Sequence, residues 1–147
     1  MRVPEGSDFP ITNLPYGVFC PTEGGHNDST QPTGGRGGRR IGVAIGDQIL
    51  DLAAVAARGL IDEPSQMLRA ATLNEFLASG KAEWDRVRAR ITQLLSEESH
   101  RGAVEKMLTA QSDCEMCLPF EVADYVDFYA SIDHASNVGA IFRPESP

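Results

Sequence analysis

Long apolar segments, abundant cysteine and an excess of basic charge are all missing from this chain of 147 residues. No apolar run approaches the ~18 residues that a membrane-spanning helix needs, and the amino terminus has no apolar segment of the secretory type. Three cysteines are too few for a disulfide scaffold. Because 21 acidic residues outnumber 13 basic ones, the net charge of −8 repels a phosphate backbone. We therefore expect a cytoplasmic protein that contacts neither membrane nor nucleic acid.

The composition is otherwise that of a globular protein, with 41% hydrophobic and 23% charged residues. The clearest local pattern predicts a β-hairpin. Ile41, Val43 and Ile45 alternate with smaller residues, and the dipeptide Gly46–Asp47 supplies a two-residue turn before an apolar run over residues 48–52. We therefore expect residues 40–52 to form a β-hairpin.

Two segments before the hairpin contrast with it. Residues 7–19 mix apolar side chains with two prolines, which predicts an extended edge segment leading into a short strand over residues 18–20. Residues 21–38 are rich in glycine and polar side chains, and we expect them to form a flexible surface loop.

Several helices are expected after the hairpin. Residues 53–58 resemble a short helix ended by Gly59, and Thr72 with Glu75 forms a capping-box pattern at the start of another. A longer helix is predicted by an apolar stripe, and a further helix is expected over residues 99–109. The stripe comprises Trp84, Val87, Ile91, Leu94 and Leu95 at helical spacing.

The character of the chain changes near residue 118, where we place a domain boundary. Beyond it, aromatic and titratable side chains become dense. Asp127 and Tyr129 share one face if the local chain is extended. A carboxylate offers hard oxygen to Ca²⁺ or Mg²⁺. From composition alone, a solvated acidic turn is the default interpretation and part of an active site is the alternative.

A short helix is predicted over residues 131–138, with Ser131 as its N-cap and Gly139 as its stop. His134 then lies one turn into this helix. Histidine takes up a proton near physiological pH, so this residue is a candidate general base.

Two other motifs have alternative readings. Cys114 and Cys117 have the spacing of half a zinc site or of a redox pair, but the other zinc ligands and the βαβ context are missing, so ordinary free thiols are the favoured interpretation. The Gly–Arg run over residues 34–40 resembles an RNA-contacting segment, yet it lacks interleaved aromatics, and a solvated loop is favoured.

Several segments together resemble one known family, in that family's order and spacing from Ser7 to Arg143. The segments are residues 7–19, 40–52, 72–74, 124–129 and 134–143. They are similar to fumarylacetoacetase. The resemblance implies a mixed α+β, mainly β fold, with an SH3-like β-barrel domain decorated by helices over residues 1–118. It also implies that a β-rich catalytic domain begins at residues 119–147.

The resemblance further implies a metal-dependent hydrolase that cleaves a carbon–carbon bond of 4-fumarylacetoacetate to give fumarate and acetoacetate, in tyrosine and phenylalanine catabolism. Asp127 matches a ligand of the family's Ca²⁺ or Mg²⁺ ion, and His134 matches the base that activates water. Tyr129 and Arg143 match substrate-binding positions. The family resemblance also implies a homodimer.

The sequence departs from the family pattern after Arg143, where the chain ends within a few residues and the family continues through its catalytic domain. The other metal carboxylates of the family lie in that later part. We therefore expect a truncated chain that is inactive alone, since one Asp cannot satisfy a hard cation that takes six or more oxygen ligands. The alternative is a non-catalytic interaction module that binds a full-length paralogue.

Overall fold

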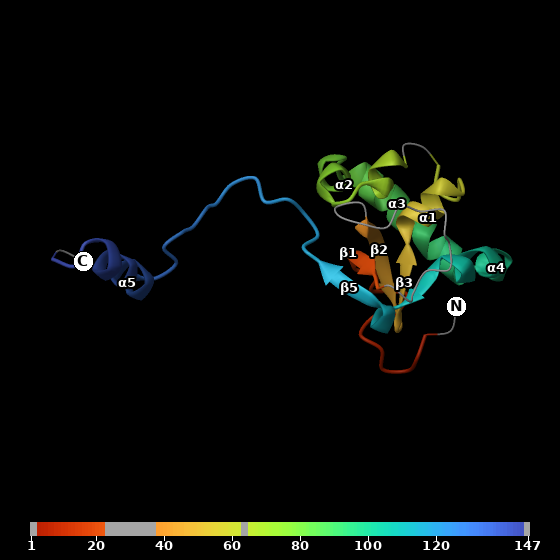
Figure 1. The fold of residues 1–147 in the computed structure, drawn as a ribbon, viewed down its shortest axis with the longest axis horizontal. Helices are drawn as coiled ribbons and strands as arrows, with labels where there is room; N and C mark the ends of the chain where they lie inside the picture. Colours follow the sequence, from red (N-terminus) through yellow and green to blue (C-terminus); the bar gives the residue numbers. More distant parts are fainter. Residues whose placement is uncertain (1–2, 23–37, 63–64, 146–147) are drawn as a thin grey trace.

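A computed structural model describes residues 3–22, 38–62 and 65–145. The predicted glycine-rich loop over residues 21–38 therefore lies almost wholly outside the described residues. Within them, an antiparallel sheet is covered by helices, and one further helix stands at the carboxyl end (Figure 1). The strands are β1 (Tyr16–Pro21), β2 (Arg40–Ile45), β3 (Gln48–Asp51), β4 (Leu108–Ala110) and β5 (Cys114–Cys117). The helices are α1 (Leu52–Ala57), α2 (Asn74–Ala78), α3 (Lys81–Ser96), α4 (Arg101–Val104) and α5 (Ile132–Phe142), with short 3-10 helices at Gln66–Arg69, Glu98–His100, Glu105–Met107 and Gln111–Asp113.

The five strands are ordered β4-β3-β2-β1-β5, and all four neighbouring pairs are antiparallel. The sheet is a half-barrel whose core side is packed against helices, so the predicted mixed α+β class is confirmed. The predicted hairpin is β2–β3, with Ile45 paired to Gln48 around the turn. Gly46 has a φ of +61°, a conformation that glycine adopts without steric cost.

The two faces of the sheet differ in what packs on them. Val18, Ile41, Val43 and Leu50 belong to the main apolar core under the helices. On the other face, a Cβ atom placed on Gly42 would lie 2.8 Å from Phe19 Cε1 and would also overlap the Ile49 side chain. Glycine at this position therefore leaves room for the Phe19 side chain, which is almost completely buried.

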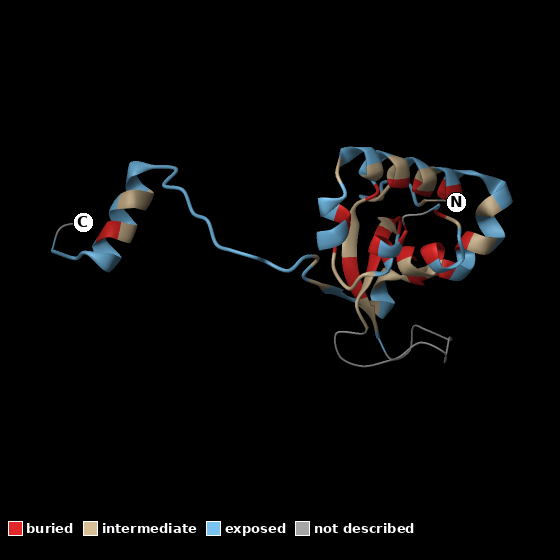
Figure 2. Ribbon diagram, turned by 90° about the horizontal axis from the view of Figure 1, so that it is seen from above, coloured by how far each residue is buried: buried red, intermediate tan, exposed pale blue. Residues whose placement is uncertain are grey.

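Helices α1 to α4 cover the core side of the sheet, and their buried residues face it (Figure 2). The apolar stripe predicted for α3 is confirmed for Val87, Ile91, Leu94 and Leu95, each at most 2% exposed. Trp84 is the exception, because 38% of this residue remains exposed. Its Nε1 donates a hydrogen bond to the Phe76 carbonyl at 2.7 Å.

Arginines on the polar side of α3 hold neighbouring loops in place. Arg88 donates to the Leu14 carbonyl and lies 4.6 Å from the centre of the Tyr16 ring. Arg90 Nε donates to the Leu60 carbonyl at 2.7 Å. These contacts tie α3 to the chain at Leu14 and Leu60.

Two sequence expectations about helix boundaries are wrong. The helix expected over residues 99–109 ends early, because Leu108 pairs with Leu50 and starts strand β4. The capping box is also wrong: α2 begins at Asn74 after Leu73, and no side chain caps it.

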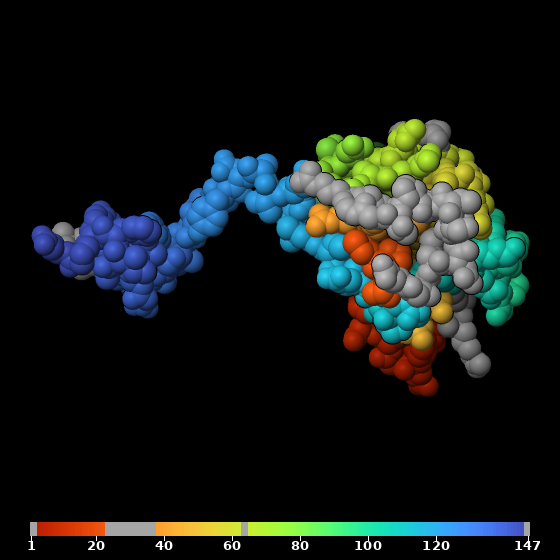
Figure 3. All heavy atoms as spheres, viewed as in Figure 1, coloured from red at the N-terminus to blue at the C-terminus, as the bar shows by residue number. Residues whose placement is uncertain are grey.

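Beyond β5 the chain leaves the sheet. Residues 121–131 are exposed throughout and join α5 to the body as a narrow arm (Figure 3). Among the described residues, no helix has both the length and the apolar character needed to cross a bilayer.

Candidate functional site

The start of the exposed arm is anchored to α2. The backbone N–H of Leu73 donates to the Pro119 carbonyl at 2.8 Å. The Asn74 side chain then makes a reciprocal pair with the backbone of Glu121, donating at 3.0 Å and accepting at 2.8 Å. A side-chain amide that bonds a backbone N–H and C=O in this way imitates a strand neighbour. The direction in which the following segment leaves the domain is therefore set by Asn74.

The amino end of α5 is built as the sequence predicts. The Ser131 hydroxyl accepts a hydrogen bond from the His134 backbone N–H at 3.1 Å, so Ser131 is the N-cap. The predicted stop at Gly139 is wrong, because the helix continues to Phe142 and the Arg143 N–H bonds back to the Gly139 carbonyl. Glycine is tolerated within a helix, and its carbonyl here closes the last turn.

Three predicted site residues lie together at this helix end. Asp127 Oδ2 is 3.7 Å from His134 Nε2, and both side chains are about two-fifths exposed, at 43% and 37%. The Tyr129 ring meets the His134 ring edge-on, with centroids 5.4 Å apart and planes at 83°. The extended segment and the first helical turn thus bring a carboxylate, an imidazole and a phenol into one cluster.

Tyr125 joins this cluster and was not among the predicted site residues. A hydrogen bond from its hydroxyl to Asp127, together with the negative charge of that carboxylate, raises the pKa of Tyr125. The signal was available in the sequence: Tyr125, Asp127 and Tyr129 alternate, so an extended chain puts all three on one face. We call Tyr125, Asp127, Tyr129 and His134 the arm cluster.

Arg143 is not brought into the arm cluster. It caps the far end of α5, nine positions after His134, which corresponds to about 13 Å along a helix axis. Its guanidinium is exposed at that end.

The arm cluster does not fit a complete site for a hard cation. In the described part of the chain, no group of three or more His, Cys, Asp or Glu side chains comes close enough to hold a metal ion. Asp127 supplies a single carboxylate, whereas Ca²⁺ takes six to eight oxygen ligands. What the cluster offers by itself is an imidazole held beside a carboxylate and two phenols in water.

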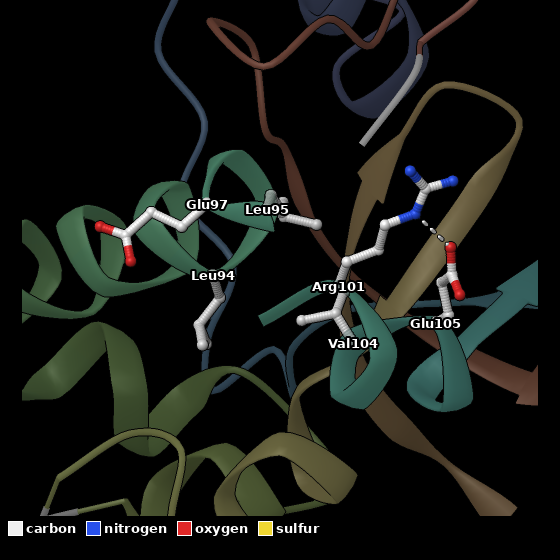
Figure 4. Close-up of a pocket in the computed structure, with 6 residues that line it drawn as sticks. All are labelled: Leu94, Leu95, Glu97, Arg101, Val104 and Glu105. Carbon is white, nitrogen blue, oxygen red and sulfur yellow. Dashed lines mark hydrogen bonds and ion pairs between the residues drawn. The ribbon is translucent and has the colours of Figure 1, made fainter. Parts of the chain in front are cut away.

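The hollows of the folded body lie away from the arm cluster. One small pocket between the end of α3 and α4 has apolar walls from Leu94, Leu95 and Val104, and the Arg101–Glu105 ion pair at 2.7 Å forms part of its polar rim (Figure 4). A wider surface hollow lies between residues 11–14 and the outer side of α3. Neither of these two hollows is lined by a predicted site residue.

Comparisons with known proteins agree in pointing to one family. A family profile described as "Fumarylacetoacetase N-terminal" matches residues 12–119. Curated relatives named fumarylacetoacetase are 46% identical in Caenorhabditis elegans, 42% in Rattus norvegicus and 40% in Homo sapiens, over 96–97% of this chain. Each alignment covers 33% of the relative, so the chain spans about a third of the length of the curated relatives it matches.

Proposed function

The chain belongs to the fumarylacetoacetase family, and from that premise we propose that it supplies the amino-terminal domain and the first catalytic segment of an enzyme that hydrolyses 4-fumarylacetoacetate to fumarate and acetoacetate. On this proposal, residues 1–118 form the amino-terminal domain, and the catalytic part begins at residue 119. The reaction would take place in the cytoplasm, in a homodimer. The observation that carries the proposal is the contact between Asp127 and His134 at 3.7 Å.

Within this function, His134 takes a proton from the water that attacks a carbonyl carbon of the substrate. The first turn of α5 holds its backbone, and the Tyr129 ring edge restricts its imidazole. A positioned general base of this kind contributes roughly 10²- to 10⁴-fold to a rate. Tyr129, from the arm before α5, and Arg143, at the far end of that helix, bind the substrate.

Asp127 is proposed as one ligand of Ca²⁺ or Mg²⁺. Because no three His, Cys, Asp or Glu side chains come together as metal ligands among the described residues, we infer that the 147-residue chain does not hold the ion alone and does not turn over substrate alone. We infer that the remaining ligands come from polypeptide outside the described residues.

A chimeric enzyme tests the site assignments. Residues 1–147 would replace the aligned third of the Caenorhabditis elegans relative, and hydrolysis would be followed by the loss of diketone absorbance with Ca²⁺ or Mg²⁺ present. We expect the chimera to be active and His134→Ala to lower kcat at least about 100-fold. Asp127→Asn should weaken metal activation, whereas the matched control Asp133→Asn, on the same helix end, should not. An active chimera that is indifferent to both His134 and Asp127 contradicts the proposal.

A second candidate function is an interaction module that binds a full-length paralogue. The observation favouring it is the apolar surface on the arm and α5: Tyr125, Phe128, Ile132 and Phe142 are each 78–82% exposed. Mixing the chain with a full-length fumarylacetoacetase of the same organism separates the two functions. An interaction module should co-elute with that enzyme in size-exclusion chromatography, and it should do so equally well with His134→Ala.

A further inference from the structure

Two cysteines that are distant in sequence meet at the edge of the sheet. Cys20 in β1 and Cys117 in β5 have their Sγ atoms 3.1 Å apart, although 97 positions separate them. In the register of these strands, Val18 pairs with Cys117 and Cys20 pairs with Glu115, so the two cysteines are diagonal neighbours. Both point to the core side, where Cys117 packs against the apolar cluster. A disulfide has a sulfur–sulfur bond of about 2.05 Å, so a shift of about 1 Å would bring the two atoms into bonding distance.

The register also shows which cysteines cannot pair. Cys114 and Cys117 are three positions apart in one strand, so their side chains point to opposite faces. Three strand residues span about 10 Å, beyond the ~7 Å between Cα atoms that a disulfide tolerates. The Cys114–Cys117 spacing in the sequence therefore does not correspond to a pair that can form a disulfide. The geometry leaves Cys20 as the partner of Cys117.

We propose that Cys20 and Cys117 form a reversible disulfide, made by exchange with a small-molecule disulfide of the glutathione type, that ties edge strand β5 to β1. One protein thiolate attacks glutathione disulfide, which gives a mixed disulfide and releases one glutathione thiolate. The second protein thiolate attacks the protein-bound sulfur, which forms the Cys20–Cys117 bond and expels the second glutathione thiolate. The two protein thiols lose two electrons and two protons, and two glutathione thiols are formed.

The consequence of this bond follows from the position of β5. It is the edge strand of the sheet and the last strand before the arm that carries Asp127 and His134. At its start, the Asp113 carbonyl is held by the Thr22 N–H and hydroxyl, each at 2.9 Å. The disulfide would fix the other end of the strand, where the chain leaves for the arm. Oxidation should therefore steady the base of the catalytic segment without touching its reactive groups.

The surroundings of Cys20 set the pace of the exchange. Burial and the hydrogen bond with Cys117 raise the pKa of the Cys20 thiol to about 11. Because the thiolate is the attacking species, exchange at neutral pH is slow. The experiment is therefore run over hours at mildly alkaline pH.

The test incubates the 147-residue chain with glutathione disulfide and maps the unreduced peptides by mass spectrometry. We expect a peptide pair that joins Cys20 to Cys117, with the loss of two hydrogens, and its disappearance after dithiothreitol. Cys114→Ser is the matched control on the same strand and should form the same bond. Cys20→Ser and Cys117→Ser should each stop at a glutathione adduct. A disulfide that contains Cys114, or persistence of two free thiols at Cys20 and Cys117, would overturn the proposal.

Thermal unfolding supplies an independent readout. Cross-linking two residues that are nearly a hundred positions apart restricts the unfolded chain strongly, so oxidised Cys114→Ser should melt at least about 5 °C above its reduced form. Neither Cys20→Ser nor Cys117→Ser should show that shift. A melting temperature that is unchanged by a mapped Cys20–Cys117 bond would contradict the tethering of β5.

Discussion

Removing the carboxylate of Asp51 should lower the free energy of unfolding of this domain more than removing any other single charged group in the described fold would. Asp51 is 2% exposed and ends strand β3. Its Oδ1 accepts a hydrogen bond from the Ala54 N–H at 3.0 Å, which makes it the N-cap of α1. Its Oδ2 lies 2.7 Å from Arg40 Nε on the neighbouring strand, and the Arg40 side chain is only 14% exposed. One carboxylate thus joins the hairpin to the first helix.

The magnitude follows from these two roles. Loss of an N-cap costs about 1 kcal/mol. Breaking a buried ion pair by removing one partner costs roughly 3–5 kcal/mol, because the remaining charge stays in a poorly solvated place. Since water reaches part of the Arg40 side chain, the lower end applies, and Asp51→Ala should reduce the free energy of unfolding by about 3–4 kcal/mol. Asp51→Asn keeps a capping oxygen and should cost about 1 kcal/mol less than Asp51→Ala.

Urea denaturation followed by circular dichroism measures these differences. The matched control is Asp85→Ala, because Asp85 forms an ion pair of similar length with Lys81, at 2.6 Å, in which both side chains are at least 65% exposed. That exposed pair should contribute less than about 0.5 kcal/mol. If Asp51→Ala lowered stability no more than Asp85→Ala does, the reasoning about burial and capping would be refuted.

Two further predictions concern backbone packing. Gly42→Ala should lower the free energy of unfolding by about 1–3 kcal/mol in urea denaturation, because its Cβ would overlap Phe19 and Ile49; wild-type stability would contradict this close packing. Asn74→Ala should speed amide exchange at Glu121 several-fold while leaving Leu50 in the sheet unchanged, because the anchor of the arm is lost; unchanged exchange at Glu121 would show that Asn74 does not hold it.

Local patterns in the sequence predict the parts of the fold that local physics controls. The β2–β3 hairpin follows from alternation and a turn glycine at Gly46, and the buried side of α3 follows from helical spacing. Ser131 is a correct N-cap prediction because the capping bond spans only three residues. In each case the deciding contact lies within one turn or one hairpin.

The errors arise where a distant partner decides. Leu108 has helical neighbours in sequence, but the free edge of β3 pairs with it and makes it strand. The expected capping box of Thr72 and Glu75 does not form, and the Asn74 side chain at the start of α2 bonds Glu121, 47 positions away. The contact between Cys20 and Cys117 could not be read from the sequence either, since only the strand register brings these two cysteines together.

The structure places Asp127, Tyr129 and His134, three residues singled out from the sequence, side by side. The contact between Asp127 and His134 has the residues that the family resemblance implies, and Tyr125 is an addition that alternation in the extended arm explains. Arg143 could not be placed from sequence, because its position depends on α5 continuing through Gly139. The roles proposed for these residues depend on groups beyond the described chain.

The most direct test of the central claim is hydrolysis of 4-fumarylacetoacetate by the purified 147-residue chain, with Ca²⁺ or Mg²⁺ added and diketone absorbance recorded. The account predicts a folded protein without turnover, because the described residues offer a cation one carboxylate at the arm cluster. Metal-dependent turnover that is abolished by His134→Ala would contradict it, since the chain would then complete the site by itself.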